Sequence, residues 1–487
     1  MRKILVGGEW RVGRGALQQT YYPADGSLTD EFPGASVEDV DEAVAAAKAA
    51  MHYPAWRDLL PHQRANYLYE ISRLITAEAE ELARLQSRDN GKTLAEARLL
   101  VASAAGTFRF FAAALETFEE TLTPPRGDYL SMSVHDPIGV VAAITPWNSP
   151  IASDAQKLAP ALAAGNGCIL KPANWTPLLA LELGRLCMEA GLPPGLVSVL
   201  PGSGSEIGDA LVRHPDVRRV SFTGGTTTGR HIAGIAAQKL MPVSLELGGK
   251  SPTIVFDDAD VDHAVDGVLF GIFSSNGQSC IAGSRLFVQR GIHDAFMERL
   301  VEKAARLRIG HPDDPATQIS PLIHPKHRDS VERYVALAVE EGGKVLCGGA
   351  RPEGGIYDQG WYYRPTVIGG LTNRARVVQE EIFGPVLVVM PFDDEAALIE
   401  EANDSVYGLA CGIWTTDYKK AWRVARRIEA ATVWINTYKQ LSIATPFGGM
   451  KESGMGREKG RLGILEYTNQ KSLYFGLNAN PLPWAGR

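Results

Sequence analysis

The sequence has few cysteines, and none is placed to bind a structural metal. Its 487 residues include five, Cys168, Cys187, Cys280, Cys347 and Cys411. An odd count in a chain of this length favours free thiols in a reducing compartment, so we expect a cytoplasmic protein. No CxxC pair and no cluster of histidine with cysteine occurs, so we expect no metal site.

Long apolar runs and basic runs are also missing. No window approaches the roughly 18 apolar residues of a membrane helix, and the opening MRKILVGGEWRVGRG lacks the apolar core of a secretory signal. We therefore expect no membrane partner. Lysine and arginine total 49 against 56 aspartates and glutamates, a net charge of −7. Nucleic-acid binding normally needs a basic stripe, so we expect no nucleic-acid partner.

The first 120 residues are predicted to be mostly helical, and the length predicts two or three domains. SVEDVDEAVAAAKAAM, residues 36–51, opens with a capping box formed by Ser36 and Asp39. Two further amphipathic stretches, residues 61–93 and 96–118, also have helical periodicity.

The pattern changes after residue 128. YLSMSVH, residues 129–135, alternates between apolar and polar side chains and predicts an edge hairpin strand. Short apolar runs then alternate with helices from residue 138 to 249, and a second series of the same kind covers residues 251–437. This alternation predicts two parallel α/β sheets. No flexible linker separates the two series, so the cleft between them is the expected site.

Cys280 differs from the other cysteines in its local sequence, NGQSCIAGSR. The other four lie in apolar strand-like runs or on a helix, as small buried hydrophobes do. Cys280 follows Asn276, Gly277, Gln278 and Ser279, a run that is poor in strand formers. Composition alone leaves two interpretations open, an inert buried residue and an exposed nucleophile.

Two other polar residues come directly after apolar strands. Glu246 in LELGGK is flanked by leucines, so its pKa would rise and it could act as a base; the alternative is an ordinary salt bridge with Lys250. Asn148 in TPWNSP could donate to a developing oxyanion, or simply occupy a turn.

A glycine turn joins a strand to a helix in SFTGGTTTG. Gly224, Gly225 and Gly229 let the backbone approach a phosphate at the helix N-terminus. The spacing is not GxGxxG, so a plain turn is the alternative.

Seven stretches follow one another in the order PWN, KPANWTP, FTGG, LELGGKSP, GQSC, EEIFGP and PFGGMKESGMGRE. In this order, with 34 residues separating Glu246 from Cys280, they resemble the aldehyde dehydrogenase superfamily, in its hydrolytic NAD(P)-dependent branch. The resemblance extends over nearly the whole chain.

The resemblance implies an α/β fold with a Rossmann-like nucleotide domain, an α/β catalytic domain and a small β oligomerisation arm. The nucleotide domain would comprise residues 1–121 and 141–247, and the catalytic domain residues 248–446. Residues 122–140 and 447–487 would form the arm and tail. Members of the family form dimers and tetramers through such an arm, so we expect a homodimer or homotetramer.

The resemblance also implies a mechanism. Cys280 would attack the aldehyde as a thiolate, and Asn148 with the Cys280 backbone N–H would hold the oxyanion. Hydride transfer to the nicotinamide would leave a thioester, which a water activated by Glu246 would hydrolyse.

For the cofactor, the resemblance assigns Lys171 to the adenosine ribose, and Glu381 and Phe383 to the nicotinamide ribose and ring. Gly225 stands where serine is usual, which removes one phosphate contact. Asn174 stands where NAD-preferring relatives usually carry a glutamate that repels the 2′-phosphate of NADP, so we expect use of both NAD and NADP. The implied dinucleotide-binding residues are Thr145, Pro146, Trp147, Lys171, Asn174, Gly204, Phe222, Gly224, Gly225, Thr228, Leu247, Glu381 and Phe383.

The expected substrate is a small-molecule aldehyde with polar or functionalised character. The positions implied for its funnel are small or polar for the most part: Ser149, Ser153, Gln156, Ser274, Leu441 and Thr445. Two alternatives stay open, a CoA-acylating semialdehyde dehydrogenase and a non-catalytic structural relative. The presence of Glu246 argues against the first, and the presence of Cys280, Glu246 and Asn148 together argues against the second.

Overall fold

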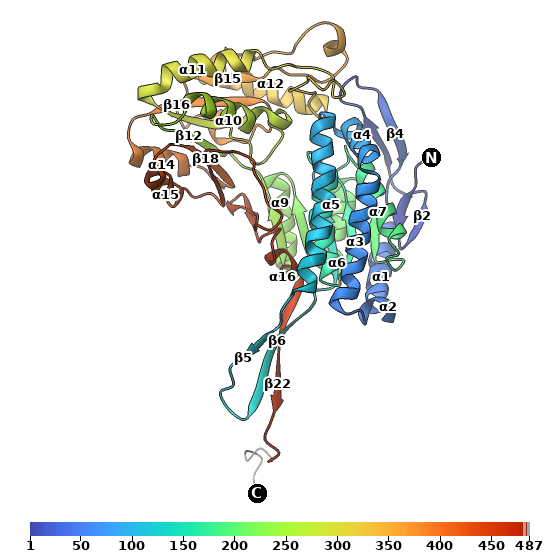
Figure 1. Ribbon diagram of the computed structural model, residues 1–487. Coiled ribbons are helices and arrows are strands. Elements are labelled where there is room, and N and C mark those ends of the chain that lie inside the picture. The colour runs from blue at the N-terminus through green and yellow to red at the C-terminus, as the bar shows by residue number, and fades with distance from the viewer. Residues whose placement is uncertain (481–483, 485–487) are drawn as a thin grey trace.

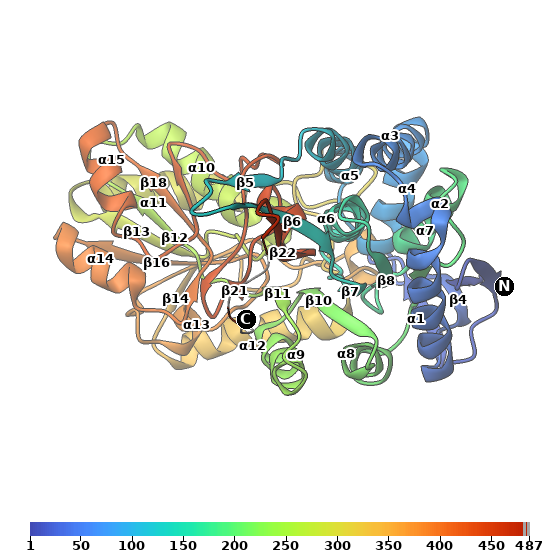
Figure 2. The ribbon, with the colours of Figure 1, turned by 90° about the horizontal axis from the view of Figure 1, so that it is seen from below.

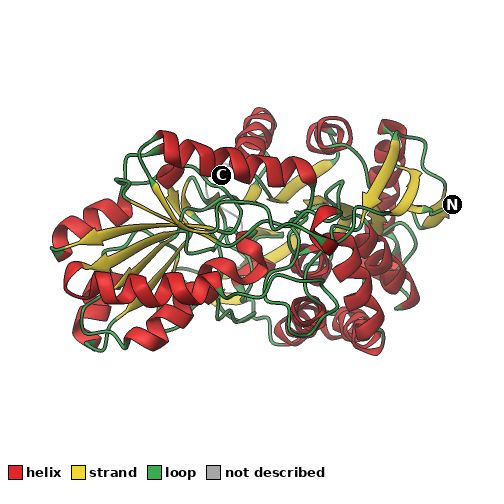
Figure 3. Ribbon diagram, turned by 90° about the horizontal axis from the view of Figure 1, so that it is seen from above, coloured by secondary structure: helices red, strands yellow, loops and turns green. Residues whose placement is uncertain are grey.

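The computed structural model describes residues 1–480 and residue 484, which form two lobes and a projecting arm (Figure 1). Each lobe is built on a twisted sheet with helices against it, and the arrangement is clearest in the second lobe, where helices cover both faces (Figure 3). Seen from below, the arm projects toward the viewer, and its strands overlie the middle of the molecule (Figure 2). The predicted α/β class is therefore confirmed.

The sheet of the first lobe has parallel strands at its centre and antiparallel strands at both edges. Its central strands are nearly continuous apolar runs because helices cover them. In the described residues the order is β2 (Glu9–Arg11), β1 (Ile4–Val6), β9 (Val197–Val199), β8 (Gly167–Lys171), β7 (Val140–Ile144), β10 (Val217–Thr223), β11 (Val243–Glu246) and β21 (Gly454–Met455).

The helices of the first lobe follow the sequence-based prediction closely. Ser36 caps the first of them through a capping box with Asp39, as predicted. Ahead of α8, the chain forms a π-helical turn (Gly204–Gly208) that continues into that helix. The helices are α1 (Val37–His52), α2 (Pro54–Arg57), α3 (Pro61–Ala77), α4 (Ala79–Asn90), α5 (Leu94–Glu116), α6 (Pro150–Ala163), α7 (Leu178–Glu189), α8 (Asp209–Arg213) and α9 (Thr226–Gln238).

Strands in the first 33 residues were not predicted. β1 and β2 form the edge of the large sheet, and β3 (Leu17–Tyr21) pairs with β4 (Leu28–Pro33) in a separate hairpin. β1 and β2 have three residues each, too few for an alternating pattern to stand out.

The second lobe has a mostly parallel sheet. Its strands, in spatial order, are β14 (Lys344–Cys347), β15 (Thr366–Gly369), β16 (Val386–Phe392), β13 (Arg285–Gln289), β12 (Pro252–Val255), β18 (Ala410–Trp414) and β19 (Thr432–Ile435). The helices are α10 (Val261–Phe273), α11 (Arg290–Ala305), α12 (Pro325–Glu340), α13 (Arg376–Gln379), α14 (Glu395–Asn403) and α15 (Tyr418–Ala425).

The arm is a three-stranded antiparallel sheet. β6 (Tyr129–Pro137) lies between β5 (Thr121–Thr123) and β22 (Thr468–Gly476), and it pairs with β22 over nine residues. The predicted strand at residues 129–135 is present, but it is the central strand of the arm and not an edge strand, because β22 from the end of the chain pairs with its second side.

Part of the segment that the sequence assigned to the arm and tail lies elsewhere. β21 pairs with β11 in the first lobe, β20 (Met450–Lys451) pairs with β17 (Tyr407–Gly408), and α16 (Leu462–Leu465) follows. These short pairings depend on tertiary contacts that no local pattern announces. Residues 481–483 and 485–487 lie outside the described residues.

Helix α5 is, in the described part of the chain, the one helix long and apolar enough to cross a membrane by length and composition. Its apolar face, including Val101, Phe108 and Phe111, is buried in the core of the first lobe. This burial makes α5 a core helix of the first lobe.

Candidate active site

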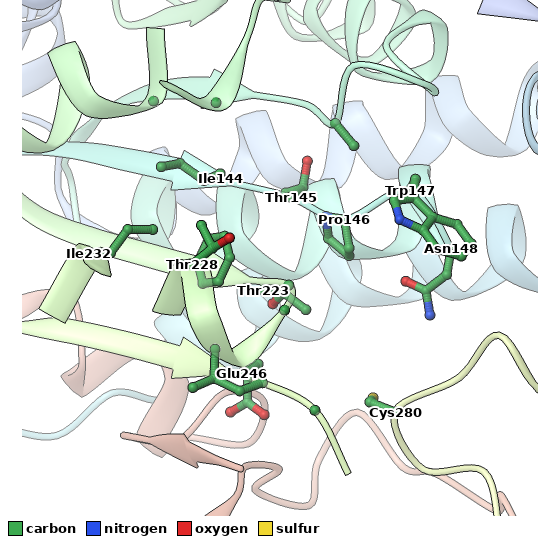
Figure 4. A pocket seen from close by; sticks show the side chains of 18 of the residues that line it. Ile144, Thr145, Pro146, Trp147, Asn148, Thr223, Thr228, Ile232, Glu246 and Cys280 are labelled. Atoms are coloured by element: carbon green, nitrogen blue, oxygen red, sulfur yellow. The ribbon is translucent and has the colours of Figure 1, made fainter. Parts of the chain in front are cut away.

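A cavity of about 460 Å³ lies where β7, β10 and β11 end at their carboxyl termini, opposite the loop that holds Cys280 (Figure 4). In open parallel sheets this edge is the usual ligand site. Glu246 from β11, Asn148 from the turn after β7 and Cys280 all line the cavity. Residues 132 positions apart in the chain thus meet at one site.

The loop before Cys280 is held in an unusual backbone conformation. Ser275 and Asn276 both have φ of 56° and Gly277 has φ of 67°. A Cβ on Gly277 would come within 2.0 Å of the Gly384 carbonyl oxygen, so only glycine fits there. The Asn276 amide donates to the Ser320 and Pro321 carbonyls at 2.8 and 2.9 Å, which fixes the loop.

Cys280 is partly exposed, whereas Cys168, Cys187 and Cys411 are fully buried. The buried-hydrophobe interpretation therefore fits those three and does not fit Cys280. Burial, followed by the charges of Glu381 and Glu246, raises the pKa of the Cys280 thiol to about 12. The thiol of the protein alone is thus protonated at neutral pH, and attack as a thiolate requires a group that takes its proton.

Glu246 ends β11 with both carboxylate oxygens buried and without a hydrogen-bond partner in the described structure. Burial and the neighbouring Glu458 raise the pKa of this carboxyl well above its ordinary value. The salt bridge to Lys250 is not formed, because the Lys250 ammonium donates to the Glu380 carbonyl at 2.7 Å. A buried carboxyl that lines a cavity and has no hydrogen-bond partner does not stabilise the fold, so it is a candidate for a chemical role as a base.

Asn148 lies against the Cys280 loop. Its Nδ2 donates to the carbonyl oxygen of Gln278 at 3.0 Å, and Pro150 begins α6 two residues later. An amide nitrogen carries two hydrogens, so one N–H remains to donate into the cavity. The position suits an oxyanion donor beside Cys280.

Lys171 and Asn174 meet at the other end of the cavity. The Lys171 ammonium lies 3.2 Å from Oδ1 of Asn174 and donates to the Pro172 carbonyl at 3.0 Å. Burial lowers the pKa of Lys171 to about 8. Both partners of this buried ammonium are neutral, so it can still donate to the hydroxyl or phosphate oxygens of a ligand.

The glycine turn leads into α9, whose first turn offers free backbone N–H groups to the cavity. A Cβ on Gly224 would come within 2.5 Å of the Phe222 ring, whereas a Cβ on Gly225 would meet nothing within 4 Å. Gly225 is the N-cap of α9. A serine would also fit at this position, because its Cβ would meet no other atom.

Glu381 and Phe383 close the cavity from the second lobe. Glu381 accepts a hydrogen bond from the Gly249 backbone at 3.0 Å, and burial raises its pKa to about 7. Phe383 has φ of 56°, and its ring meets Trp147 edge-on at 5.2 Å. His327 bonds to the Phe383 carbonyl at 2.8 Å and holds this strained residue.

All thirteen residues that the sequence assigned to the dinucleotide line this one cavity, with the three assigned to catalysis. The sequence did not single out the remaining lining residues, because they fill space between the motifs or come from distant helices. They are Ile144, Ala173, Gly208, Asp209, Thr223, Ile232, Gly248 and His327.

The six positions assigned to the substrate funnel do not line the cavity. The Ser149 and Ser153 hydroxyls lie 3.0 Å apart at the start of α6. Gln156 donates to Glu458. Ser274 begins the Cys280 loop, and Leu441 and Thr445 are exposed on the segment after β19.

A dinucleotide-sized cavity at the ends of parallel strands, with a cysteine, a free carboxyl and an amide at one end, defines a class of protein. It is a nucleotide-dependent oxidoreductase that works through a cysteine.

The chain belongs to the aldehyde dehydrogenase family, whose model matches residues 10–473. It is 42% identical over 448 residues to a betaine aldehyde dehydrogenase of Bacillus subtilis, covering 92% of this chain and 91% of that protein. It is 41% identical over 480 residues to a phenylacetaldehyde dehydrogenase of Pseudomonas fluorescens, covering 97% and 95%. An NAD+ complex of a Bacillus cereus aldehyde dehydrogenase superposes with a TM-score of 0.95 at 39% identity, covering 98% of this chain and 97% of that one.

The protein is therefore an NAD-dependent aldehyde dehydrogenase. It oxidises an aldehyde to a carboxylic acid through the cysteine thiohemiacetal and thioester of its family. The two alternatives, a CoA-acylating enzyme and a non-catalytic relative, are not what the comparisons support.

Proposed function

We propose that Cys280 is the nucleophile, Glu246 the base and Asn148 the oxyanion donor of this oxidation. The observation that carries the proposal is that the three line one end of the cavity, where Cys280 is partly exposed and is the one cysteine among the lining residues. Bound NAD supplies the carbon that accepts the hydride. Every other step falls to side chains of this chain.

The Glu246 carboxylate takes the proton of the Cys280 thiol, and the sulfur bonds to the aldehyde carbon. The Asn148 amide and the Cys280 backbone N–H donate to the resulting oxyanion. Glu246 releases the thiol proton to solvent. After hydride loss it takes a proton from water, whose oxygen bonds to the acyl carbon while the Cys280 thiolate leaves. The test is a single-turnover assay of NADH release with Cys280→Ala, which must show none.

The thirteen cavity residues named above are proposed to bind the dinucleotide. Lys171 and Asn174 would receive the adenosine ribose, the first turn of α9 the pyrophosphate, and Glu381 with Phe383 the nicotinamide end. The absence of a carboxylate at Asn174 supports the use of NADP as well as NAD. Asp209 also lines the cavity, and its carboxylate lies 2.9 Å from Nε2 of His231.

We further propose the division into nucleotide domain, catalytic domain and arm that the family implies, with β21 belonging to the nucleotide sheet. The arm supports a homodimer or homotetramer, because it projects from the body and carries exposed Leu122, Tyr474 and Phe475 (Figure 1). Five unpaired cysteines support a reducing, cytoplasmic location. Sedimentation of the purified protein tests the assembly, since a monomer would contradict it.

The six funnel residues are proposed to meet a polar or functionalised aldehyde. Their positions support this proposal. Ser149 directly follows Asn148 and is the N-cap residue of α6, Ser153 lies on the first turn of that helix, and Ser274 is six residues ahead of Cys280.

A further inference from the structure

Two lysines lie close to Cys280 but outside the dinucleotide cavity. The Lys459 ammonium lies over the Phe447 ring, 5.1 Å from its centroid. Phe447 and Cys280 pack against the same small apolar cluster, which includes Trp434 and Tyr438. Neither Lys459 nor Lys439 lines the cavity that holds the proposed dinucleotide site, so neither is needed to hold the dinucleotide.

Lys439 reaches the start of the Cys280 loop. Its ammonium donates to Ser274 Oγ at 2.8 Å and to the Ser274 carbonyl at 3.2 Å. It lies within electrostatic range of Lys92, Glu96 and the Cys280 thiol, and burial lowers its pKa to about 7. Lys459 lies within range of the Cys280 thiol and of Glu246 in the same way, and burial lowers its pKa too.

No carboxylate in the described residues forms an ion pair with Lys439, Lys459 or Lys92. The two nearest carboxylates already have other partners. Glu458 is paired with Lys157 and bonded by Gln156. Glu96 accepts from the Ser275 backbone at 2.7 Å and from Thr93.

Both lysines also sit in a backbone region that disfavours side chains. Lys439 has φ of 56° and Lys459 has φ of 61°. Glycine or asparagine would occupy these positions at lower cost. Glu246 also lies within electrostatic range of Lys459 but forms no ion pair with it. Lysines on strained backbone whose ammonium groups form no ion pair are unfavourable for the protein alone, and such features concentrate where a ligand supplies the missing partner.

We propose that the substrate of this enzyme carries a carboxylate at the end remote from its aldehyde, and that Lys459 and Lys439 bind that carboxylate. The inference rests on the proposed role of Cys280, because it places the aldehyde carbon at that thiol. A carboxylate accepts charge-assisted hydrogen bonds from ammonium groups, a neutral aldehyde leaves them unpaired, and a cationic one is repelled.

The substrate class is thus an ω-oxo acid, and the product a dicarboxylate. The aldehyde carbon loses a hydride to NAD and gains an oxygen from water; two protons are released, and the distal carboxylate is unchanged. This narrows the polar or functionalised aldehyde of the funnel proposal to an anionic one.

The test compares three aldehydes that differ in charge at one end: 4-oxobutanoate, its neutral amide 4-oxobutanamide, and 4-(trimethylammonio)butanal. NADH formation gives kcat/KM for each. We expect the acid to exceed the amide by at least about tenfold, and the cation to be the poorest, since an ion pair near a protein surface contributes on the order of one to several kcal/mol.

Variants separate a binding role from a chemical one. Lys459→Met and Lys439→Met should each lower the acid-to-amide ratio of kcat/KM by at least about fivefold, mainly through KM, and Lys459→Arg should restore most of it. Lys344→Met, at an exposed lysine of β14 in the second lobe, is the matched control and should leave the ratio unchanged.

Two results would overturn the proposal. One is a wild-type enzyme that oxidises acid and amide equally well. The other is a lysine variant that slows both aldehydes by the same factor, which would mean that the lysine acts on Cys280 or Glu246. In either case NADH would still form with the wild type, and single turnover with Cys280→Ala tests the nucleophile separately.

Discussion

Lys157 and Glu458 form an ion pair that is almost completely shielded from solvent, although 301 residues separate them in the chain. Lys157 comes from α6, and Glu458 from the segment that follows β21. The pair lies next to Glu246: the charge of Glu458 raises the pKa of Glu246, and the charge of Lys157 lowers it. A structural ion pair therefore tunes the proposed base.

Glu458→Gln should extend activity to lower pH. Glu246 acts only when unprotonated, so its activity is lost as pH falls through its pKa. Removing the negative neighbour lowers that pKa, and the acid limb of the steady-state rate should move down in pH. A pH profile of kcat checks this, and a limb that moves up would contradict it.

The same variant should unfold more easily. It leaves Lys157 buried without its counter-charge, which typically costs about 3–5 kcal/mol. Lys157→Met in the Glu458→Met background should recover much of the loss, because an apolar pair of similar volume replaces the ions. Chemical denaturation of the wild type, of Glu458→Gln and of the Lys157→Met, Glu458→Met double variant gives the free energy of unfolding of each.

Cys280→Ala should abolish oxidation while leaving NAD binding and the melting temperature close to those of the wild type, because the thiol supplies chemistry rather than packing. Iodoacetamide should label Cys280 in a Cys347→Ser background, where the other three cysteines are fully buried. Substrate should protect the thiol. A Cys280→Ala enzyme with a tenth of the wild-type rate would disprove the covalent route.

Glu246→Gln should give a burst of about one NADH per active site and then a slow steady state. Deacylation should fall by about 10²–10⁴, as is typical when a positioned base is lost. Acylation should slow less than deacylation, because solvent water can take the thiol proton in place of Glu246. Stopped-flow absorbance at the NADH band separates the phases. Glu452→Gln, at an exposed glutamate paired with Arg230, should show wild-type turnover.

Asn148→Ala should lower the rate by about 10²–10³, the usual effect of losing one oxyanion donor. Asn148→Asp should be at least as slow, because it places a negative charge beside the forming oxyanion. Titration with NAD should show that both variants still bind the cofactor. An aspartate variant with near wild-type activity would remove Asn148 from this role.

Asn174→Glu should shift cofactor preference toward NAD by at least about tenfold, because the new carboxylate repels a 2′-phosphate a few ångströms away. For the wild type, kcat/KM with NAD and with NADP should lie within about a hundredfold of each other. Both ratios are measured at saturating aldehyde. A wild-type preference for NAD beyond a thousandfold, or an unchanged ratio in the variant, would rule out a controlling role for Asn174.

Much of this architecture is encoded locally. The capping box at Ser36 and the apolar strands near residues 140–144 and 217–223 can be recognised from their residue types and from the periodicity of their apolar residues. The glycine turn after β10 is equally local. These are the parts of the fold and of the cavity that the sequence predicts by itself.

Other parts depend on residues far apart. His327 contacts Phe383 from a distant helix, and no motif around it announces that role. Lys439 and Lys459 look like ordinary charged residues of polar turns until the fold brings both within electrostatic range of Cys280. The unpaired state of Glu246 likewise becomes visible only when Lys250 is seen bonded elsewhere.

The pairing of β21 with β11 sets an order of events during synthesis. Residues 243–246 leave the ribosome about two hundred residues before their edge partner, so the first sheet stays open at that side while the second lobe is made. Lys157 waits longer for Glu458, which follows it by 301 residues. Since unpaired strand edges promote aggregation, nascent chains halted between residues 250 and 450 should be the ones that chaperones must hold.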